Sequence, residues 1–156
     1  MRLLPAFASA LLSGCLLSAQ AGVQLFERYP EQWRGHVVGE PIMLAGRQLV
    51  TTAGQLQRLS PSVYSARSLR NVNIYLTLPS AIAVQPSKAW ALSRNDGGAQ
   101  TWTALLVYIN AGERISSAEG FFFTAPTPGL IFVDYIITAQ EMGEPLRGRF
   151  AIEVTP

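Results

Sequence analysis

The clearest pattern in this chain is an alternation of apolar and polar positions between Asn71 and Leu78. The apolar positions are Val72, Ile74, Leu76 and Leu78. Successive side chains of a β-strand point to opposite faces of a sheet, so this pattern is typical of a strand with one buried face. Pro79 follows directly and ends the predicted strand.

Short β-rich runs separated by turn residues fill the rest of the chain after residue 22. We predict strands at His36–Val38, Pro41–Leu44, Gln48–Thr52, Ala81–Val84, Ala89–Ser93, Thr101–Ile109, Gly120–Thr124, Leu130–Ala139 and Arg149–Val154. The residues Asn95 to Gly98 tolerate positive φ and predict a tight hairpin between two of these strands. Gln55 to Ser68 is polar and contains Ser60-Pro61-Ser62, which indicates a loop.

Helical periodicity is absent from the sequence after residue 22. Many short strands, spaced by roughly 8–12 residues with Gly, Pro and Asn turns, favour a sandwich of two sheets. We therefore predict an all-β fold, an Ig-like antiparallel β-sandwich that forms a single domain. Residues 22–50 would supply an N-terminal extended arm and the first short strands, and residues 51–156 the core of that domain.

The N-terminus has the features of a signal peptide. Met1-Arg2 is positively charged, and the apolar stretch Leu3 to Leu17 is too short to cross a bilayer as a stable helix. Ala19-Gln20-Ala21 then places small residues at the positions that signal peptidase reads. We expect residues 1–21 to be removed and the mature chain to begin at Gly22.

A second interpretation of the same segment remains open. Leu12-Ser13-Gly14-Cys15 resembles the lipobox of bacterial lipoproteins, in which case residues 1–14 would be removed and the sulfur of Cys15 lipidated. Both interpretations predict an exported protein that is periplasmic, associated with the outer membrane or exposed at the cell surface. Contact with a membrane is expected only through that lipid anchor.

The composition excludes several classes of protein. Hydrophobic residues make up 49% of the chain and charged residues 14%, so a folded core is expected rather than disorder. The net charge is only +2 and the arginines are scattered, so nucleic-acid binding is not expected. Cys15 is the only cysteine, which rules out an intrachain disulfide framework.

The chain also lacks the residues that most catalytic and metal sites need. His36 is the only histidine, and the mature chain has no free thiol under either interpretation of the leader. Zinc sites of the Cys/His type therefore cannot form, and a Ser-His-Asp triad has only one candidate base. We expect a non-enzymatic protein with no catalytic residues, no cofactor and no metal.

Two predicted strands are apolar on both faces, although a sandwich needs only one apolar face per sheet. In Thr101–Ile109 the two faces are Trp102, Ala104 and Leu106, and Leu105, Val107 and Ile109. In Leu130–Ile137 they are Ile131, Val133, Tyr135 and Ile137, and Leu130, Phe132 and Ile136. The second face would be covered by the N-terminal arm of the same chain or by a partner protein.

The candidate partner-contact residues are few. Val23 to Gly35 indicates an edge strand or an extended arm, and its aromatic side chains Phe26, Tyr29 and Trp33 are candidates for packing on the domain or on a neighbour. Asp134 lies in the middle of an apolar strand. It is expected to lie on the sheet surface, or to contact an arginine of a partner or of the neighbouring strand, Arg147 or Arg149.

The middle of the chain resembles a known family. The run from Asn71 to Pro79, followed by Ile82 and Val84, is similar to the nV-x-v-x-x-x-LP-x-x-v segment of bacterial surface-protein Ig-like repeats, the conserved-repeat domains of stalks. The features that follow in the same order are Trp102-Thr103, Ala111-Gly112-Glu113, Phe121 to Phe123, Pro128-Gly129 and Asp134 to Ala139. The resemblance covers roughly residues 68 to 155. It implies an Ig-like fold and a structural or binding role.

Together these features predict a protein that acts through protein–protein contacts at the cell envelope. A subunit of a surface appendage, or an accessory of a secretion or adhesion assembly, is the leading hypothesis, with an envelope protein or a second copy of the chain as partner. The alternative is a periplasmic module that binds a carbohydrate or another small ligand. That alternative predicts a concave pocket with polar groups near Trp90 or Trp102.

The intact mass of the chain purified from a fractionated bacterial host tests the two interpretations of the leader. Cleavage by signal peptidase predicts the mass of residues 22–156 without modification, in a fraction not anchored by lipid. Lipoprotein processing predicts a chain that starts at Cys15, carries the mass of its lipid and stays with the membranes. A full-length mass in the cytoplasmic fraction would contradict both.

Overall fold

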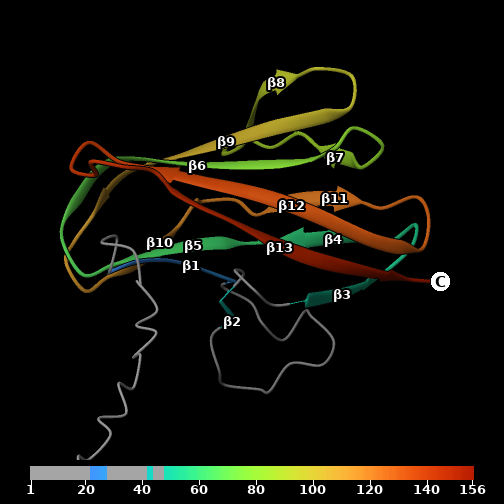
Figure 1. Cartoon of the computed structure of the whole chain (residues 1–156), viewed down its shortest axis with the longest axis horizontal. Coiled ribbons are helices and arrows are strands. Elements are labelled where there is room, and N and C mark those ends of the chain that lie inside the picture. The colour runs from blue at the N-terminus through green and yellow to red at the C-terminus, as the bar shows by residue number, and fades with distance from the viewer. Residues whose placement is uncertain (1–21, 28–41, 44–47) are drawn as a thin grey trace, which may run out of the picture.

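A computed structural model of the chain describes residues 22–27, 42–43 and 48–156, and all regular secondary structure in these residues is β-strand (Figure 1). The strands are β1 (Val23–Glu27), β2 (Ile42–Met43), β3 (Gln48–Thr52), β4 (Leu56–Leu59), β5 (Pro61–Ser65), β6 (Leu69–Pro79), β7 (Ala83–Gln85), β8 (Ala91–Asn95), β9 (Ala99–Ile109), β10 (Arg114–Ser116), β11 (Phe121–Thr124), β12 (Gly129–Thr138) and β13 (Leu146–Thr155). The predicted all-β sandwich is confirmed.

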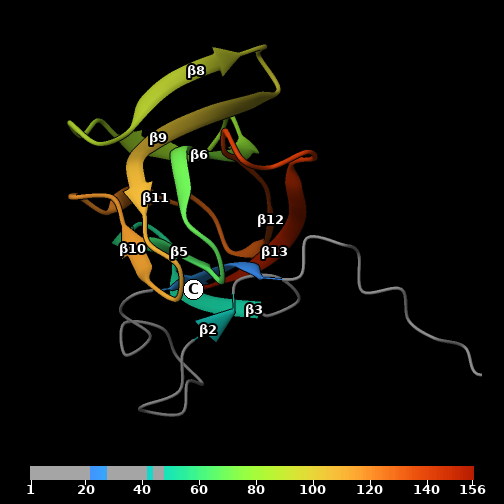
Figure 2. The ribbon, with the colours of Figure 1, turned by 90° about the vertical axis from the view of Figure 1, so that its left-hand side faces the viewer.

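The strands form two layers. One layer is a six-stranded sheet in the order β3-β13-β12-β6-β9-β8, in which all neighbours are antiparallel except β13 and β3, which run parallel. The other layer contains the shorter sheets β10-β5-β1-β2 and β4-β11-β7, and only Ser60 separates β4 from β5. In Figure 2 the six-stranded sheet curves from β8 and β9 round to β3 and encloses the side on which β5, β10 and β11 lie.

Strand β12 lies at the centre of the six-stranded sheet. It pairs with β13 from Gly129↔Val154 to Ile137↔Leu146, and with β6 from Asp134↔Thr77 to Thr138↔Asn73. Its inward side chains are all buried, as the alternation predicted: Ile131, Val133, Tyr135 and Ile137. Full burial of an apolar side chain of this size stabilises the fold by roughly 1.5–3 kcal/mol, so this row forms a substantial part of the core.

The predicted hairpin between β8 and β9 is confirmed. Asn95 pairs with Gln100 across the turn, and Gly97 has a φ of 84°. The side chains of the turn satisfy its backbone: the Gly97 amide donates to Asn95 Oδ1 and the Ala99 amide to Asp96 Oδ1, each over 3.1 Å. The Asn and Asp residues are thus explained by turn geometry.

The loop predicted over Gln55–Ser68 is wrong, because β4 and β5 occupy most of this segment. Ser62 and Ser65 of β5 are small enough to be buried, and their hydroxyls donate to backbone carbonyl oxygens. The Ser62 hydroxyl, for example, donates to the Phe26 carbonyl oxygen over 3.3 Å. Pro61 is tolerated because it is the first residue of β5, a position where proline occurs in sheets.

The predicted placement of Ile109 on the same face as Leu105 and Val107 is also wrong. Ile109 is buried opposite Leu69. The alternation fails because Asn71 of β6 adopts a positive φ of 52°, and neither Asn71 nor the facing Val107 belongs to a paired position. Each strand therefore has two successive exposed residues, Arg70 and Asn71 in β6 and Val107 and Tyr108 in β9. The residue after each pair is buried again.

Strand β1 covers Val23–Glu27 of the segment predicted to be an edge strand or an extended arm, and in these residues it is not an edge strand. It lies between β5 and β2, and its Val23 and Leu25 side chains belong to the core. The chain is already fixed at Gly22, whose carbonyl oxygen accepts a hydrogen bond of 2.7 Å from the Ala66 amide. The leader with Cys15, the strand predicted at His36–Val38, and the side chains of Tyr29, Trp33 and His36 lie outside the described residues.

Replacing Gly148 by alanine is expected to lower the free energy of unfolding by about 1–3 kcal/mol, the usual range for overpacking a core. Gly148 pairs with Tyr135, whose buried phenol ring occupies the space that a Cβ would take. Gly143→Ala is the matched control, because a Cβ there would meet no atom within 4 Å. Urea unfolding measures both, and equal stabilities of the two variants would contradict this packing.

Candidate functional site

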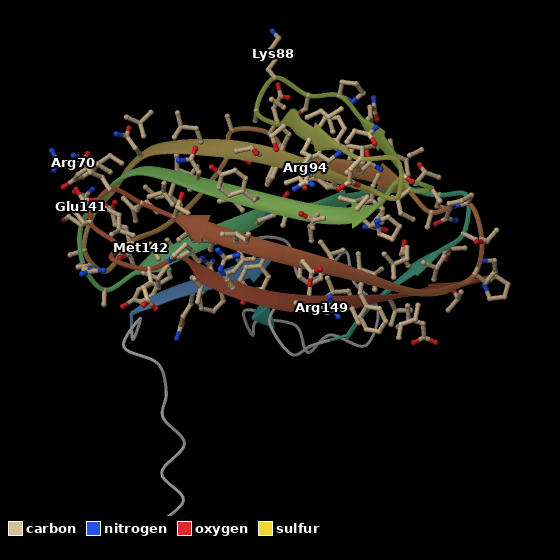
Figure 3. The ribbon with its side chains drawn as sticks, turned by 45° about the horizontal axis from the view of Figure 1, so that its top comes forward. Arg70, Lys88, Arg94, Glu141, Met142 and Arg149 are labelled. Carbon is tan, nitrogen blue, oxygen red and sulfur yellow. The ribbon has the colours of Figure 1, made fainter. Side chains whose placement is uncertain are left out.

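The face of the six-stranded sheet that points away from the core, here named the outer face, is the most distinctive surface of the described residues. It is formed by alternate side chains of four strands: Arg147, Arg149, Ala151 and Glu153 of β13; Leu130, Phe132, Asp134 and Ile136 of β12; Asn73, Tyr75 and Thr77 of β6; and Thr101, Thr103, Leu105 and Val107 of β9. Figure 3 shows this side of the sheet, with Arg149 labelled on β13.

Exposed apolar side chains gather on the six-stranded sheet. Within the described residues the large exposed hydrophobic side chains are Leu56, Leu92, Leu105, Val107, Tyr108, Leu130 and Phe132. All of them except Leu56 belong to this sheet. On the outer face they form one cluster of Leu130 and Phe132, 51% and 49% exposed, and another of Leu105 and Val107, 55% and 72% exposed. These are four of the residues that the two-sided strands predicted to lie opposite the core.

The described part of the N-terminal arm does not cover this face. Residues 23–27 pair with β5 in the opposite layer. Phe26 is half-buried there, with the guanidinium carbon of Arg114 lying 5.7 Å from the centre of its ring. Residues 23–27 therefore do not cover the outer face. The rest of the predicted arm, with Tyr29 and Trp33, lies outside the described residues, and covering of the face by it stays a prediction.

Asp134 lies at the centre of the outer face and holds Arg149 of the neighbouring strand. Arg149 donates from Nε to Oδ1 over 2.6 Å and from Nη2 to Oδ2 over 3.0 Å. These hydrogen bonds raise the pKa of the Arg149 guanidinium, which also lies over the Phe132 ring at 5.6 Å. Of the two arginines that the sequence offered as intrachain partners, the structure selects Arg149; contact of Asp134 with another protein stays a prediction.

A polar band continues from this ion pair across the sheet. Asp134 faces Thr77, and Thr77 faces Thr101, with 2.9 Å between the two threonine hydroxyl oxygens. The band separates the cluster of Leu130 and Phe132 from that of Leu105 and Val107. Because the charges of the band neutralise each other and the threonines bond to each other, the band can be covered at a smaller desolvation penalty than isolated charges.

The tryptophans that were candidates for a ligand pocket are core residues. Trp90 and Trp102 are buried, and both pack edge-on against Phe121, with ring centres 5.2 and 6.1 Å apart. Their indole N–H groups donate within the chain, to the Glu119 carbonyl oxygen over 3.3 Å and to Gln100 Oε1 over 2.9 Å. Neither ring is free to stack on a sugar.

One hollow in the described residues lies inside the core, and another is open to solvent. A void of about 10 Å³ in the core is lined entirely by apolar side chains, Leu76, Phe121 and Ile131 among them. This volume is at the limit for a single water molecule, which would find no polar partner there. An open hollow of about 370 Å³ lies beside Ser62, Arg114 and Ser116, on the second layer.

Among residues 22–27, 42–43 and 48–156, no group of three or more His, Cys, Asp or Glu side chains is placed to hold a metal ion. The same residues contain no helix long and apolar enough to cross a membrane.

Sequence reasoning missed the arginines that lie over aromatic rings. Arg149 lies over Phe132, Arg114 over Phe26, and Arg58 over Phe122 at 5.9 Å. Each pair joins residues of different strands, so only the register brings the two side chains together. The alternation placed Phe132 on the second face of its strand, but no pattern in the sequence indicated which arginine lies over each ring.

Comparisons with known proteins add little to these observations. Neither a protein-family model nor a curated protein matches the chain. Among solved structures it is similar to a non-cellulosomal cohesin from the archaeon Archaeoglobus fulgidus, with a TM-score of 0.45, 11% identity and coverage of 72% of this chain and 88% of that one. It is also similar to the PapD-like domain of human CEP192, with a TM-score of 0.42, 9% identity and coverage of 97% and 98%. The β-sandwich fold is established by the strand pairing itself.

The pKa of Glu141 at the end of the sheet is expected to lie below that of an ordinary glutamate. Arg70 donates to its carboxylate from Nε over 2.6 Å and from the backbone amide over 2.7 Å (Figure 3). Because the folded-state pKa is lowered, any stabilisation by this pair is present above the unfolded-state pKa. It is lost as the pH falls through the folded-state value.

Carboxyl carbon shifts followed by NMR during an acid titration check this expectation. Arg70→Gln removes the larger cause and should move the pKa of Glu141 back up, whereas Arg67→Gln, on the preceding loop, should leave it unchanged. An unchanged titration of Glu141 in the Arg70 variant would contradict the assignment of the cause.

Proposed function

We propose that this chain is an exported, non-enzymatic β-sandwich that acts through protein–protein contacts at the cell envelope, as a subunit of a surface appendage or an accessory of a secretion or adhesion assembly. The observation that carries this proposal is the outer face, where two apolar clusters flank a neutralised polar band. Large exposed apolar side chains that gather on one face often mark an interaction site, and four of those in the described residues lie on this face.

The composition of the outer face supports a role in binding a protein. Interfaces are typically apolar at their centre, rich in aromatic residues and arginine, and poor in unpaired charges. The outer face has Phe132, Tyr75 and Arg149 near its centre, and the central Asp134 is already paired. Covering Leu130, Val107 and their neighbours would remove apolar area from water at roughly 25 cal/mol per Å², which supplies a driving force without a pocket.

The position of Gly22 supports export with cleavage after Ala21. Gly22 has a φ of 124°, and a Cβ there would lie 2.9 Å from the Ala66 Cβ, so the chain is already closely packed at this residue. A cut between Ala21 and Gly22 leaves all the described strands intact. Processing at Cys15 instead would leave the intervening residues as a tether between the lipid and β1.

Photo-crosslinking in living cells tests the proposal. Benzoylphenylalanine in place of Leu130 or Val107, one in each cluster, should give protein crosslinks on irradiation. The same residue in place of Leu56 should give few, because Leu56 is 58% exposed but lies in the opposite layer on β4. Absence of crosslinks from both clusters, or equal crosslinking from Leu56, would overturn the proposal.

A further inference from the structure

We infer that the open hollow beside β5 and β10 binds a small hydroxylated molecule that carries a carboxylate or phosphate group, such as an acidic or phosphorylated sugar. The hollow lies in the second layer, so the inference does not depend on the proposed role of the outer face. Its volume is about 370 Å³, and the described residues that line it are Ser62, Arg114, Ile115 and Ser116. Small-molecule sites typically measure roughly 300–1,000 Å³, so the size fits such a ligand.

The register of β5 and β10, which lie side by side (Figure 2), brings the polar side chains of the hollow together. Ser116 pairs with Ser62, and Arg114 lies two residues before Ser116. Residues two apart on a strand point to the same face of a sheet, as do residues that pair directly. Arg114 and the two serine hydroxyls therefore share one face, and Phe26, which pairs with Ser62 from the other side, shares it too.

Arg114 supplies the positive charge of the hollow. Its guanidinium carbon lies 5.7 Å from the centre of the Phe26 ring, and the side chain is exposed. The carboxylate of the preceding Glu113 is held in its own turn, where Oε2 accepts from the side-chain amide of Asn110 over 2.6 Å. A planar guanidinium that is held over a ring keeps its N–H groups at the edge of the plane. In that arrangement it binds a carboxylate or phosphate through two parallel hydrogen bonds.

Arg114 differs from the other arginines that lie over rings in the described residues. Arg149 is paired with Asp134, and Arg58 has a further interaction within the chain. Arg114 lines the hollow, and no carboxylate in the described part of the chain forms an ion pair with it. An anion that enters the hollow therefore meets a cation whose charge no described side chain neutralises.

Ser62 indicates that the ligand carries hydroxyl groups as well as a charge. The Ser62 hydroxyl donates to the Phe26 carbonyl oxygen over 3.3 Å, so its own oxygen can still accept a hydrogen bond from a ligand hydroxyl. The hollow of about 370 Å³ also far exceeds the roughly 30 Å³ that one water molecule takes in the liquid. It therefore has room for more than a bare oxyanion.

An NMR titration of the exported chain tests the inference, with glucuronate, glucose 6-phosphate, glucose and inorganic phosphate as probes. The two charged sugars should shift the backbone amide signals of β5 and β10 and the Nε–H signal of Arg114. Glucose should bind at least about tenfold more weakly, because it lacks the oxyanion that forms charge-assisted hydrogen bonds. The tighter of the two charged sugars identifies the oxyanion that the site prefers.

Matched variants assign the roles of the side chains. Arg114→Gln should weaken binding of both charged sugars by about tenfold or more. Lys88→Gln removes the same charge from the loop between β7 and β8 (Figure 3) and should leave binding unchanged. Ser62→Ala should weaken binding of the two sugars but not of inorganic phosphate. Thermal unfolding of each variant verifies that the fold is retained.

The outcomes that overturn the inference are separate from those of the crosslinking experiment, which reports on the other layer. Absence of shifts in β5 and β10 with both charged sugars at millimolar concentrations, or equal affinity for glucose, would reject the site. Binding that survives Arg114→Gln, or that Lys88→Gln weakens as much, would reject Arg114 as its anion-binding residue. Inorganic phosphate that binds as tightly as the sugars would reject a hydroxylated ligand.

Discussion

The pairing register of β12 decides which side chains this chain buries and which it presents. A slip of one residue would put Leu130 and Phe132 into the core and Val133 and Tyr135 into solvent, because side chains alternate between the two faces of a sheet. The contact of Tyr135 with Gly148 opposes such a slip, since the buried phenol ring fits only where its cross-strand partner has no side chain. The contact between Tyr135 and Gly148 therefore fixes both the packing of the core and the set of side chains on the outer face.

Local alternation was sufficient to predict the long strands, because β6 and β12 carry their two-residue period in their own sequence. It failed where the determining contact lies elsewhere in the chain. The serines of β5 were taken for a loop because their backbone acceptors belong to other segments, such as the Phe26 carbonyl oxygen. Ile109 was placed on the wrong face because the irregularity originates at Asn71, on the neighbouring strand.

The sequence likewise predicted part of the candidate site but not all of it. Apolar residues on both faces of two strands indicated an unsatisfied surface, and the structure places Leu105, Val107, Leu130 and Phe132 on it. The choice of Arg149 as the partner of Asp134 required the register between β12 and β13.

Phenylalanine rings at the surface are less exposed in the second layer than in the six-stranded sheet. In the second layer, Phe26 and Phe122 are half-buried and each has an arginine over its ring. In the six-stranded sheet, Phe132 stays about half exposed even with Arg149 over it. Leu105, Val107 and Leu130 are more exposed still. This difference in how the aromatic rings are covered supports the proposal that the outer face contacts a partner.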